Sequence, residues 1–558
     1  MFHHETIAEL VRARAGDDRA GLVCAGGSYT HAEVVTEASV RAAWLSAHRG
    51  AGPFHVAVLL DNVAEYVFWL QGAALAGAVV VGANSTHRGD ELARDLSHTE
   101  CQLFVTSSDS LPLVEGRRIG EAFGTVHAAD ERVLIVDNPD SAGALGEFAG
   151  ATPPDPKESA ITPDTLGYLL FTSGTSGAPK ACRCSQGRLA RISAVVAEMF
   201  ELTPGDVCYL SMPLFHSNAL MAGWGPALAA GSTVALPSAG RFSASNFLPD
   251  VRRFGATYFN YVGKPLAYVL ATPERPDDAD NPLVRAFGNE GATADLVRFA
   301  ERFACTVTDA YGSTEGGATV ARTPDTPPGA LGRAPEGTVV LDAETGEECP
   351  VARFDNRGRL ENAEVAIGEL VSKGGGAGFE GYWRNEDAEK ARLRDGWYWT
   401  GDLAYRDEAG FFYFAGRDHD WLRVDGENFA SAPIERIVER HRDVVLAAVY
   451  AVPDTVVGDQ VMVALQLRPD VGGFDPGAFA AFLADQDDLG TKWAPRFVRI
   501  TEALPVTATN KVLKKAIRSE RWNCDDPVWW RPDKAGPYRR LTGVERATLD
   551  DAVSDRTL

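Results

Sequence analysis

The first part of the chain alternates short apolar runs with amphipathic stretches. Residues 55–60 (HVAVLL) form one apolar run of strand length, and residues 79–82 (VVVG) form another. Between them, residues 61–76 are rich in Ala and Leu and predict a helix that ends before Gly77. Apolar strands separated by helices are typical of a parallel sheet that is covered on both faces.

The same alternation resumes after a proline-rich connector at residues 150–165. Helices are expected at about residues 187–200 and 294–303. The strands expected in this part are residues 166–173, 206–213, 232–237, 255–262, 283–291 and 305–312. The sequence therefore predicts an α/β fold whose large N-terminal domain holds two similar α/β lobes.

From about residue 338 to residue 414 the pattern changes to short strands with Gly, Asp and Asn turns, which predicts a small β section. Two strong strands, residues 444–452 and 460–467, and a helix follow in a small α+β segment. We therefore expect three parts: an N-terminal domain of residues 1–416, a C-terminal domain of residues 417–525, and a polar tail of residues 526–558.

One apolar stretch, residues 66–83, has about the length of a membrane span. Its sequence divides at Gly77 into the end of a predicted helix and a predicted strand. A helix between two parallel strands accounts for this run without lipid, so we expect no transmembrane segment.

Charge and cysteine content narrow the function classes. The chain of 558 residues has 54 Lys and Arg against 77 Asp and Glu, a net charge of −23. Such an acidic chain is a poor nucleic-acid binder, because that binding needs clustered basic residues. Eight cysteines are too few for a disulfide scaffold of this length. Without a secretory pattern at the start, we expect a cytoplasmic protein.

Residues 171–180, FTSGTSGAPK, combine small hydroxyl residues with glycines after a predicted strand. Hydroxyl donors, closely approaching backbone N–H groups and the charge of Lys180 make a phosphate cradle. The loop is not a Walker motif, because Pro179 precedes the lysine and Ala181 follows it. A flexible Ser/Gly linker is the alternative.

This loop resembles the phosphate-binding signature of adenylate-forming enzymes, which include acyl-CoA synthetases. Further stretches resemble other signatures of that superfamily in the same order: YGSTEGG (311–317), GELVSKGG (368–375), and residues 396–417, 423–435 and 505–511. Residues 55–96, 258–278 and 287–303 look most like the very-long-chain acyl-CoA synthetase branch, which includes the fatty-acid-transport proteins.

The resemblance implies a ligase that joins a large hydrophobic carboxylic acid to coenzyme A through an acyl adenylate, using ATP and Mg²⁺. Lys511 would reach the substrate carboxylate and the α-phosphate, and Glu315 would hold Mg²⁺. Tyr311 would pack on adenine. The positions implied to bind nucleotide or coenzyme A are Thr172, Ser173, Gly174, Thr175, Ser176, Gly177, Lys180, Gly288, Asn289, Tyr311, Gly312, Thr314, Asp402, Arg417, Gly426 and Glu427.

The acyl pocket is implied at three residues. His216 would lie near the substrate carboxylate, and Trp224 and Tyr261 would line the pocket. For these aromatic residues a place in the core is an equal alternative, and for His216 a structural role is the alternative. For Asp402 and Arg417, an ion pair at a domain edge is the alternative to ribose binding. For Lys511, a solvated basic turn is the alternative.

In the superfamily the C-terminal domain rotates between the two half-reactions, so the resemblance implies a mobile domain with its hinge at His419. Four positions depart from the family pattern: Arg183, Gln186, His419 and Asp425. Arg183 would need a partner if its strand were buried. A reduced ligase that only forms the thioester from a supplied adenylate is therefore an alternative, and a homodimer is left open.

Residues 376–381, GAGFEG, match the G-x-G-x-x-G pattern, and Asp402 follows about 20 residues on. This pattern allows a dinucleotide-dependent oxidoreductase as a further alternative. The segment that follows is polar and has little surface to pack on a sheet, which favours the ligase.

Overall fold

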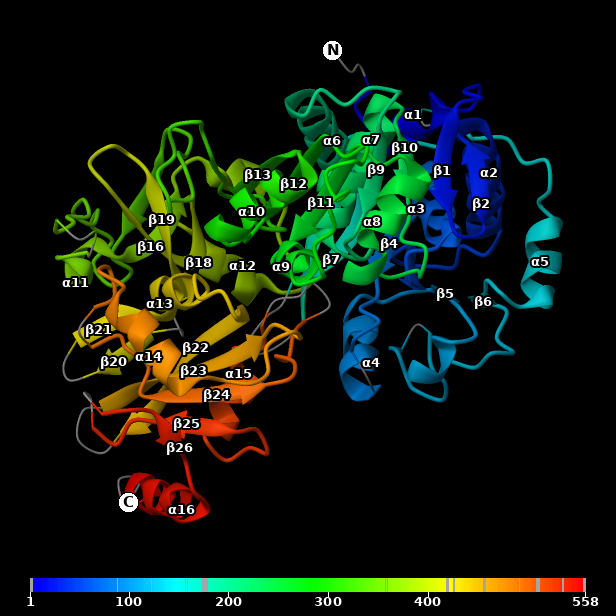
Figure 1. Ribbon diagram of the computed structural model, residues 1–558. Coiled ribbons are helices and arrows are strands. Elements are labelled where there is room, and N and C mark those ends of the chain that lie inside the picture. The colour runs from blue at the N-terminus through cyan, green and yellow to red at the C-terminus, as the bar shows by residue number, and fades with distance from the viewer. Residues whose placement is uncertain are drawn as a thin grey trace.

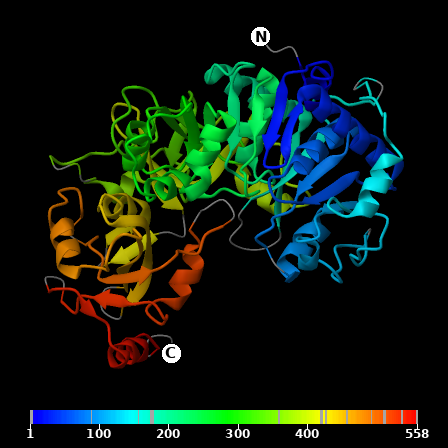
Figure 2. The same ribbon diagram turned by 45° about the vertical axis from the view of Figure 1, so that its right-hand side comes forward.

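In the computed structural model, the described residues are 4–87, 89–121, 123–155, 157, 159–172, 179–356, 358, 360–417, 421–424, 427–454, 458–490, 492–507, 512–533 and 536–554. The chain forms a large N-terminal part and a smaller C-terminal domain beside it (Figures 1 and 2). The predicted α/β fold is confirmed.

Two sheets form the two predicted α/β lobes. Strands β3–β4, β3–β5 and β4–β7 pair in parallel in one sheet, and β9 to β13 pair in parallel in the other. The first sheet has the order β6 (Val133–Ile135), β5 (Leu103–Thr106), β3 (His55–Leu59), β4 (Val79–Gly82), β7 (Leu166–Thr172), β8 (Lys180–Ser185). The second has the order β14 (Val320–Ala321), β13 (Thr306–Tyr311), β12 (Arg285–Asn289), β11 (Tyr258–Val262), β9 (Val207–Leu210), β10 (Thr233–Ala235), β1 (Ala20–Cys24), β2 (Gly27–Thr30).

A layer of helices packs between these two sheets. One apolar cluster joins Val56 of β3 and Leu210 of β9 to helices of this layer. The layer contains α1 (Ile7–Arg12), α2 (His31–Ala47), α3 (Ala64–Ala76), α6 (Gln186–Met199), a π-helical turn (Ala219–Trp224) and α7 (Gly225–Ala230). The outer faces are covered by α4 (Gly89–His98) on the first sheet and by α8 (Ala244–Phe254), α9 (Pro265–Leu270) and α10 (Thr293–Phe303) on the second.

The apolar stretch at residues 66–83 follows from this layering. Helix α3 is covered on all sides, with Tyr66 and Trp69 fully buried, so it has no polar face. It ends at Gly77, whose φ of 68° is the left-handed conformation that favours glycine. Strand β4 then begins at Val79. No helix within the described ranges is long and apolar enough to cross a bilayer.

The predicted β section forms a third sheet after these lobes. Its strands are β15 (Thr338–Leu341), β16 (Gly368–Ser372), β18 (Trp397–Arg406), β17 (Leu393–Arg394) and β19 (Phe412–Arg417). Short helices accompany it and the loops of the first lobe: α5 (Pro139–Gly146), α11 (Ala363–Ala366), α12 (Glu386–Arg392), and 3-10 turns at Leu111–Leu113 and Gly375–Gly378.

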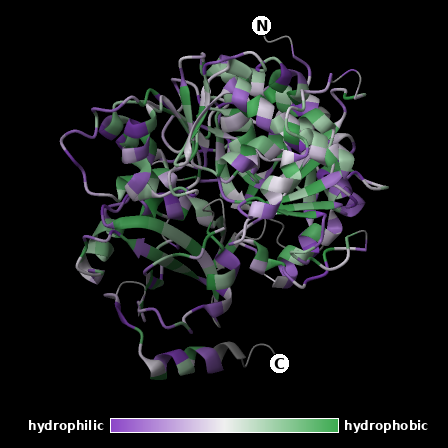
Figure 3. Ribbon diagram, turned by 90° about the vertical axis from the view of Figure 1, so that its right-hand side faces the viewer, coloured by the Kyte–Doolittle hydropathy of each residue, from purple (hydrophilic) through white to green (hydrophobic). Residues whose placement is uncertain are grey.

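The C-terminal domain is built on a fourth sheet. Its order is β21 (Glu427–Ala430), β20 (Trp421–Val424), β23 (Gly458–Leu467), β24 (Phe497–Thr501), β25 (Val528–Trp530), β26 (Arg539–Arg540), with β22 (Val444–Asp454) also paired to β23. Helices α13 (Ser431–Val438), α14 (Pro476–Ala484), α15 (Lys514–Glu520) and α16 (Gly543–Ser554) surround it. The hydropathy colouring shows polar residues on the helix near the C-terminus (Figure 3).

Residues 528–530 and 539–540, which the sequence places in a separate tail of residues 526–558, take part in this sheet. Strand β25 pairs with β24, and β26 pairs with β25. Val528, Tyr538 and Leu541 are buried in the domain core. The apolar run of β25 is only three residues long and β26 is Arg539–Arg540, so no periodic pattern reveals the two short strands.

Candidate active site

Hydrogen bonds to two distant segments hold the end of β13 and the loop that follows it. The Tyr311 hydroxyl donates to Asp402 Oδ2 at 2.6 Å, and the hydroxyls of Ser217 and Thr314 lie 2.7 Å apart. The YGSTE residues thus meet both the loop after β9 and strand β18. This point lies beyond the carboxyl ends of parallel strands, where open α/β sheets bind ligands.

Asp402 and Arg417 are opposite each other on the antiparallel strands β18 and β19. This register brings together the two residues expected at the nucleotide ribose, although the Arg417 side chain lies outside the described part. Burial and the neighbouring Asp402 carboxylate raise the pKa of Tyr311 well above its ordinary value. The Tyr311 hydroxyl therefore stays protonated and acts as a donor to the carboxylate.

Glu315 is a nearly buried carboxylate, with 6% of its surface exposed. It accepts a 2.8 Å hydrogen bond from the Tyr382 hydroxyl. Burial and this carboxylate raise the pKa of Tyr382, so the phenol remains a donor. Within the described ranges no group of three His, Cys, Asp or Glu residues could hold a metal. A metal ion at Glu315 would therefore need ligands from phosphate and water, which is usual for Mg²⁺.

His216 lies in the loop between β9 and the π-helical turn. Its Nδ1 accepts a 3.3 Å hydrogen bond from the Asn218 backbone N–H. The Asn218 side chain donates to Asn289 Oδ1 at 3.3 Å and accepts from Asn260 at 2.7 Å. Asn289 in turn donates to the Ala310 carbonyl at 2.5 Å. This chain of amides connects the His216 loop to the strand that carries Tyr311.

Trp224 and Tyr261, expected in an acyl pocket, are both fully buried. Trp224 packs between the sheets, and Tyr261 lies in the core beneath α9 and α10. Gly288 pairs with Tyr261 in the parallel register of β11 and β12. The Tyr261 hydroxyl donates to Asp309 Oδ2 at 3.0 Å. Contact of Trp224 or Tyr261 with an acyl group stays a prediction.

Several expected site residues lie outside the described part of the chain: Ser173, Gly174, Thr175, Ser176, Gly177, His419, Asp425, Gly426 and Lys511, together with the Glu427 side chain. The ends of the FTSGTSGAPK loop are described. Thr172 and Lys180 are opposite each other on the antiparallel strands β7 and β8. Gly312 is exposed in the loop that follows Tyr311.

Two of the four departures from the family pattern have a structural explanation. Arg183 lies on an exposed face of β8, so it does not need the partner that a buried arginine would require. Cys182 and Cys184 are buried on the opposite face of β8. Gln186 is fully buried, accepts from the Ala8 N–H at 3.0 Å and donates to the Ala74 carbonyl at 2.9 Å. Its amide joins three helices of the central layer.

Sequence reasoning missed two residues that support the YGSTE loop. Arg188, with 3% exposure, donates to the Thr314 carbonyl at 2.6 Å. Tyr382 binds Glu315 as described above. Both contacts join segments far apart in the chain, so no local pattern marks them. Ser217 and Asn218 could have been noticed, because they follow His216 directly.

The GAGFEG stretch does not bind a dinucleotide in the usual way. It follows β16, which pairs antiparallel with both of its neighbours, and a 3-10 turn begins at Gly375. A Cβ atom on Gly378, inside this stretch, would collide with the Gly316 carbonyl. Glycine is therefore required here by close packing against the YGSTEGG loop, and the oxidoreductase alternative has no support.

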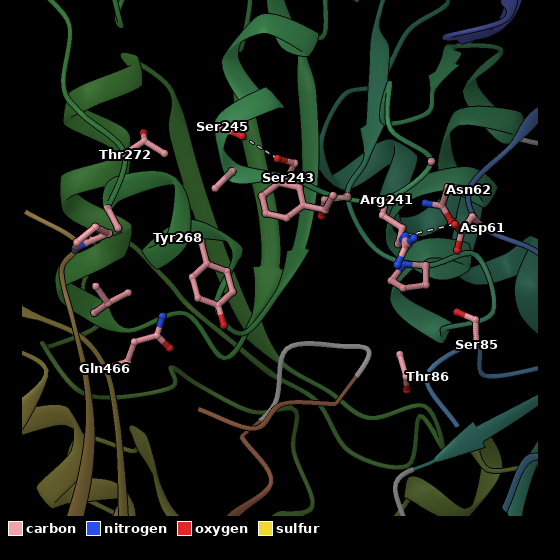
Figure 4. A pocket seen from close by; sticks show the side chains of 18 of the residues that line it. Asp61, Asn62, Ser85, Thr86, Arg241, Ser243, Ser245, Tyr268, Thr272 and Gln466 are labelled. Atoms are coloured by element: carbon pink, nitrogen blue, oxygen red, sulfur yellow. Dashed lines mark hydrogen bonds and ion pairs between the residues drawn. The ribbon is translucent and has the colours of Figure 1, made fainter. Parts of the chain in front are cut away.

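A cavity of about 900 Å³ lies between the N-terminal part and the C-terminal domain. Figure 4 shows Asp61, Asn62 and Arg241 on one side of it, Tyr268 and Thr272 on another, and Gln466 of the C-terminal domain. Pro213 and Phe215, which precede His216, also line it. Its wall is mixed in polarity, with several hydroxyl and amide side chains.

Comparison with known proteins gives the family. Residues 10–383 match the model of the AMP-binding enzyme family, and residues 433–511 match the AMP-binding enzyme C-terminal domain. The chain belongs to the AMP-binding enzyme family. The resemblance to adenylate-forming enzymes is thereby confirmed.

The chain is 51% identical to steroid-22-oyl-CoA synthetase of Rhodococcus jostii over 547 residues, covering 98% of this chain and 96% of that protein. It is 45% identical to the medium/long-chain-fatty-acid–CoA ligase FadD17 of Mycobacterium tuberculosis, covering 94% and 98%. Among solved structures, ATP-bound MatB of Rhodopseudomonas palustris matches with a TM-score of 0.74, 25% identity and coverage of 92% and 98%.

Proposed function

We propose that this protein is an acyl-CoA ligase that activates a large hydrophobic carboxylic acid with ATP and transfers the acyl group to coenzyme A. The observation that carries the proposal is the hydrogen-bonded group of Tyr311, Thr314, Glu315 and Asp402 in a chain of this family. The steroid and fatty acids named for the two curated relatives support a large hydrophobic substrate.

In the first step the substrate carboxylate attacks the α-phosphorus of ATP, the bond to pyrophosphate breaks, and an acyl adenylate forms. Asp402 would accept the ribose hydroxyls, because the paired oxygens of a carboxylate suit a diol. The Thr314 hydroxyl would donate a hydrogen bond to the α-phosphate. Lys511 would stabilise the negative charge that develops there, a form of electrostatic catalysis.

Mg²⁺ would supply charge neutralisation of the phosphates when bound. Glu315 is the residue proposed to hold it. Local cations are needed because the chain carries a net charge of −23, which disfavours a polyphosphate. Lys180 would contribute a second positive charge at the edge of the phosphate loop.

In the second step the thiol of coenzyme A loses its proton and attacks the acyl carbon, and AMP leaves with the electrons of the broken C–O bond. The interdomain cavity is the proposed path for coenzyme A. It is lined by the exposed Arg241, by Phe215, which directly precedes His216, and by Arg468 of the C-terminal domain. Hydroxyl and amide groups on its wall suit the amides of pantetheine better than a hydrocarbon.

The proposal is tested by two assays on the purified protein. Acid-dependent ATP–pyrophosphate exchange measures the first step, with palmitate, a steroid side-chain acid, and acetate as the small control. Mass spectrometry of the thioester measures the whole reaction. We expect exchange and thioester with a large acid only. Thioester from synthetic adenylate without exchange would indicate a reduced ligase, and no activity in either assay would refute the proposal.

A further inference from the structure

The C-terminal domain docks on helix α9 of the N-terminal part. Ala267 of α9 belongs to the same apolar cluster as Val445 and Leu446 of β22, and Tyr268 and Ala271 pack against it. Tyr268, Ala271 and Val445 also line the interdomain cavity. This contact therefore forms one wall of the cavity.

An ion pair crosses the same domain boundary. The Lys264 ammonium, at the N-terminal end of α9, lies 2.6 Å from Glu439 Oε1 at the C-terminal end of α13. The two side chains are only 19% and 12% exposed. Burial alone would lower the pKa of Lys264, but the carboxylates of Glu439, Glu435 and Asp295 raise it, so the ammonium stays charged.

Helix α13 connects this ion pair to the segment that contains Lys511. Glu435 lies one helical turn before Glu439 and forms a 2.9 Å ion pair with Lys514, three residues after Lys511. Lys514 also donates to Ser431 at 2.8 Å. Val512, the residue after Lys511, packs against the cluster that includes Ala267 of α9. Helix α13 thus connects the Lys264–Glu439 ion pair at one end to the residues that follow Lys511 at the other.

We propose that Lys264 and Glu439 are a positioning pair that holds the C-terminal domain in its adenylating orientation. The pair acts through α13 and the Glu435–Lys514 contact on the segment of Lys511. This inference rests on the proposed function, in which Lys511 serves the first step. Removal of one member leaves a buried charge without its partner, which is costly in the docked state and costless once the domains separate.

The test compares Lys264→Met, Glu439→Gln and the charge-swapped double variant Lys264→Glu with Glu439→Lys. Single-turnover adenylate formation and thioester formation from synthetic adenylate are measured separately. We expect each single variant to slow adenylation at least tenfold and to change the thioester step less than threefold. The swapped pair should recover most of the adenylation rate, because an ion pair is restored across the boundary.

Arg440→Ala is the matched control. Arg440 follows Glu439 directly, but its ion pair with Asp488 at 2.6 Å lies within the C-terminal domain. This variant should leave both steps within twofold of the parent rates. Equal loss of both steps in the single variants, unchanged adenylation, or no recovery in the swapped pair would each overturn the proposal.

Docking is also measured without catalysis by hydrogen–deuterium exchange. Peptides covering residues 264–271 and 444–452 should exchange faster in Lys264→Met than in the parent, and unchanged in Arg440→Ala. Equal exchange in the parent and in Lys264→Met would overturn the positioning role. A parent protein without adenylation would refute the proposed function, while this exchange measurement would still decide whether the pair docks the domain.

Discussion

The Tyr311 hydroxyl donates a 2.6 Å hydrogen bond to Asp402, across 91 residues of sequence. The bond fixes a carboxylate of β18 against the last residue of β13, and thereby joins the second lobe to the β section. The aromatic ring expected at adenine and the carboxylate expected at ribose are therefore direct neighbours, as one nucleoside would require.

Replacing Asp402 tests this nucleotide site. Hydrogen bonds to a charged group contribute about 1.5–3 kcal/mol. We therefore expect Asp402→Ala to raise the KM for ATP roughly tenfold to a hundredfold, with the KM for the acid changed less than threefold. Tyr311→Phe keeps the ring and should have a smaller effect. Steady-state exchange kinetics measure both, and an unchanged KM for ATP in Asp402→Ala would place the ribose elsewhere.

Variants of Glu315 and Tyr382 distinguish a metal-binding role of Glu315 from a structural one. Glu315→Gln keeps an acceptor for the Tyr382 hydroxyl but removes the charge. We expect adenylation to fall on the order of a hundredfold, with a higher Mg²⁺ concentration for half-maximal rate, because charge stabilisation of phosphates contributes several kcal/mol. Tyr382→Phe keeps the charge and should lose less than fivefold. Equal losses in a Mg²⁺ titration of both variants would instead indicate that Glu315 supports the loop.

Strands such as β3 and β4 could be predicted because they are short, nearly continuous apolar runs, at His55–Leu59 and Val79–Gly82. Strand β1 was not predicted: only two of its five residues are buried, and its partner β10 lies some 210 residues away. The identity of the site residues came from the family resemblance. Their supports, such as Arg188 on the Thr314 carbonyl, depend on tertiary contacts that a local pattern does not contain.

Gln186 is another residue whose role depends on tertiary packing and not on a local sequence pattern. The departure from the family pattern raised the alternative of a reduced ligase, whereas its amide holds α1 and α3 against α6. Gln186→Leu leaves two buried backbone groups without this partner, each at about 1–3 kcal/mol. We expect a loss of about 2–4 kcal/mol in urea unfolding and a KM for ATP within twofold of the parent. A raised KM at unchanged stability would instead link Gln186 to the phosphate loop.

Filling the interdomain cavity tests the proposed path of coenzyme A. Ser245 lines the cavity, and its side chain bonds the Ser243 hydroxyl at 2.9 Å. We expect Ser245→Trp to raise the KM for coenzyme A at least tenfold by steric exclusion, and to leave ATP–pyrophosphate exchange within twofold. Ser245→Ala removes the hydroxyl without filling space and is the control. If Ser245→Trp raises the KM for the acid instead, the cavity holds the acyl group.

The buried carboxyl of Asp309 makes the stability of the fold depend on pH. It is 7% exposed and accepts hydrogen bonds from the Tyr261 hydroxyl at 3.0 Å and the Gly291 N–H at 2.9 Å. Burial raises its pKa from 3.8 to about 7, although these bonds and Arg322 lower it, and Glu290 raises it further. The folded state thus binds this proton more tightly than the unfolded state does.

The sign of the effect follows from this raised pKa. The stabilisation is fully present below pH 4 and is lost as the pH rises toward 7, because the buried carboxyl must ionise. We expect the unfolding free energy of the parent, relative to Asp309→Asn, to fall by roughly 2–3 kcal/mol between pH 5 and pH 7 and to level off above pH 8. Urea unfolding of both proteins across this range measures the difference. A difference that stays constant with pH would mean that Asp309 is already ionised at pH 5, despite its burial beneath Tyr261.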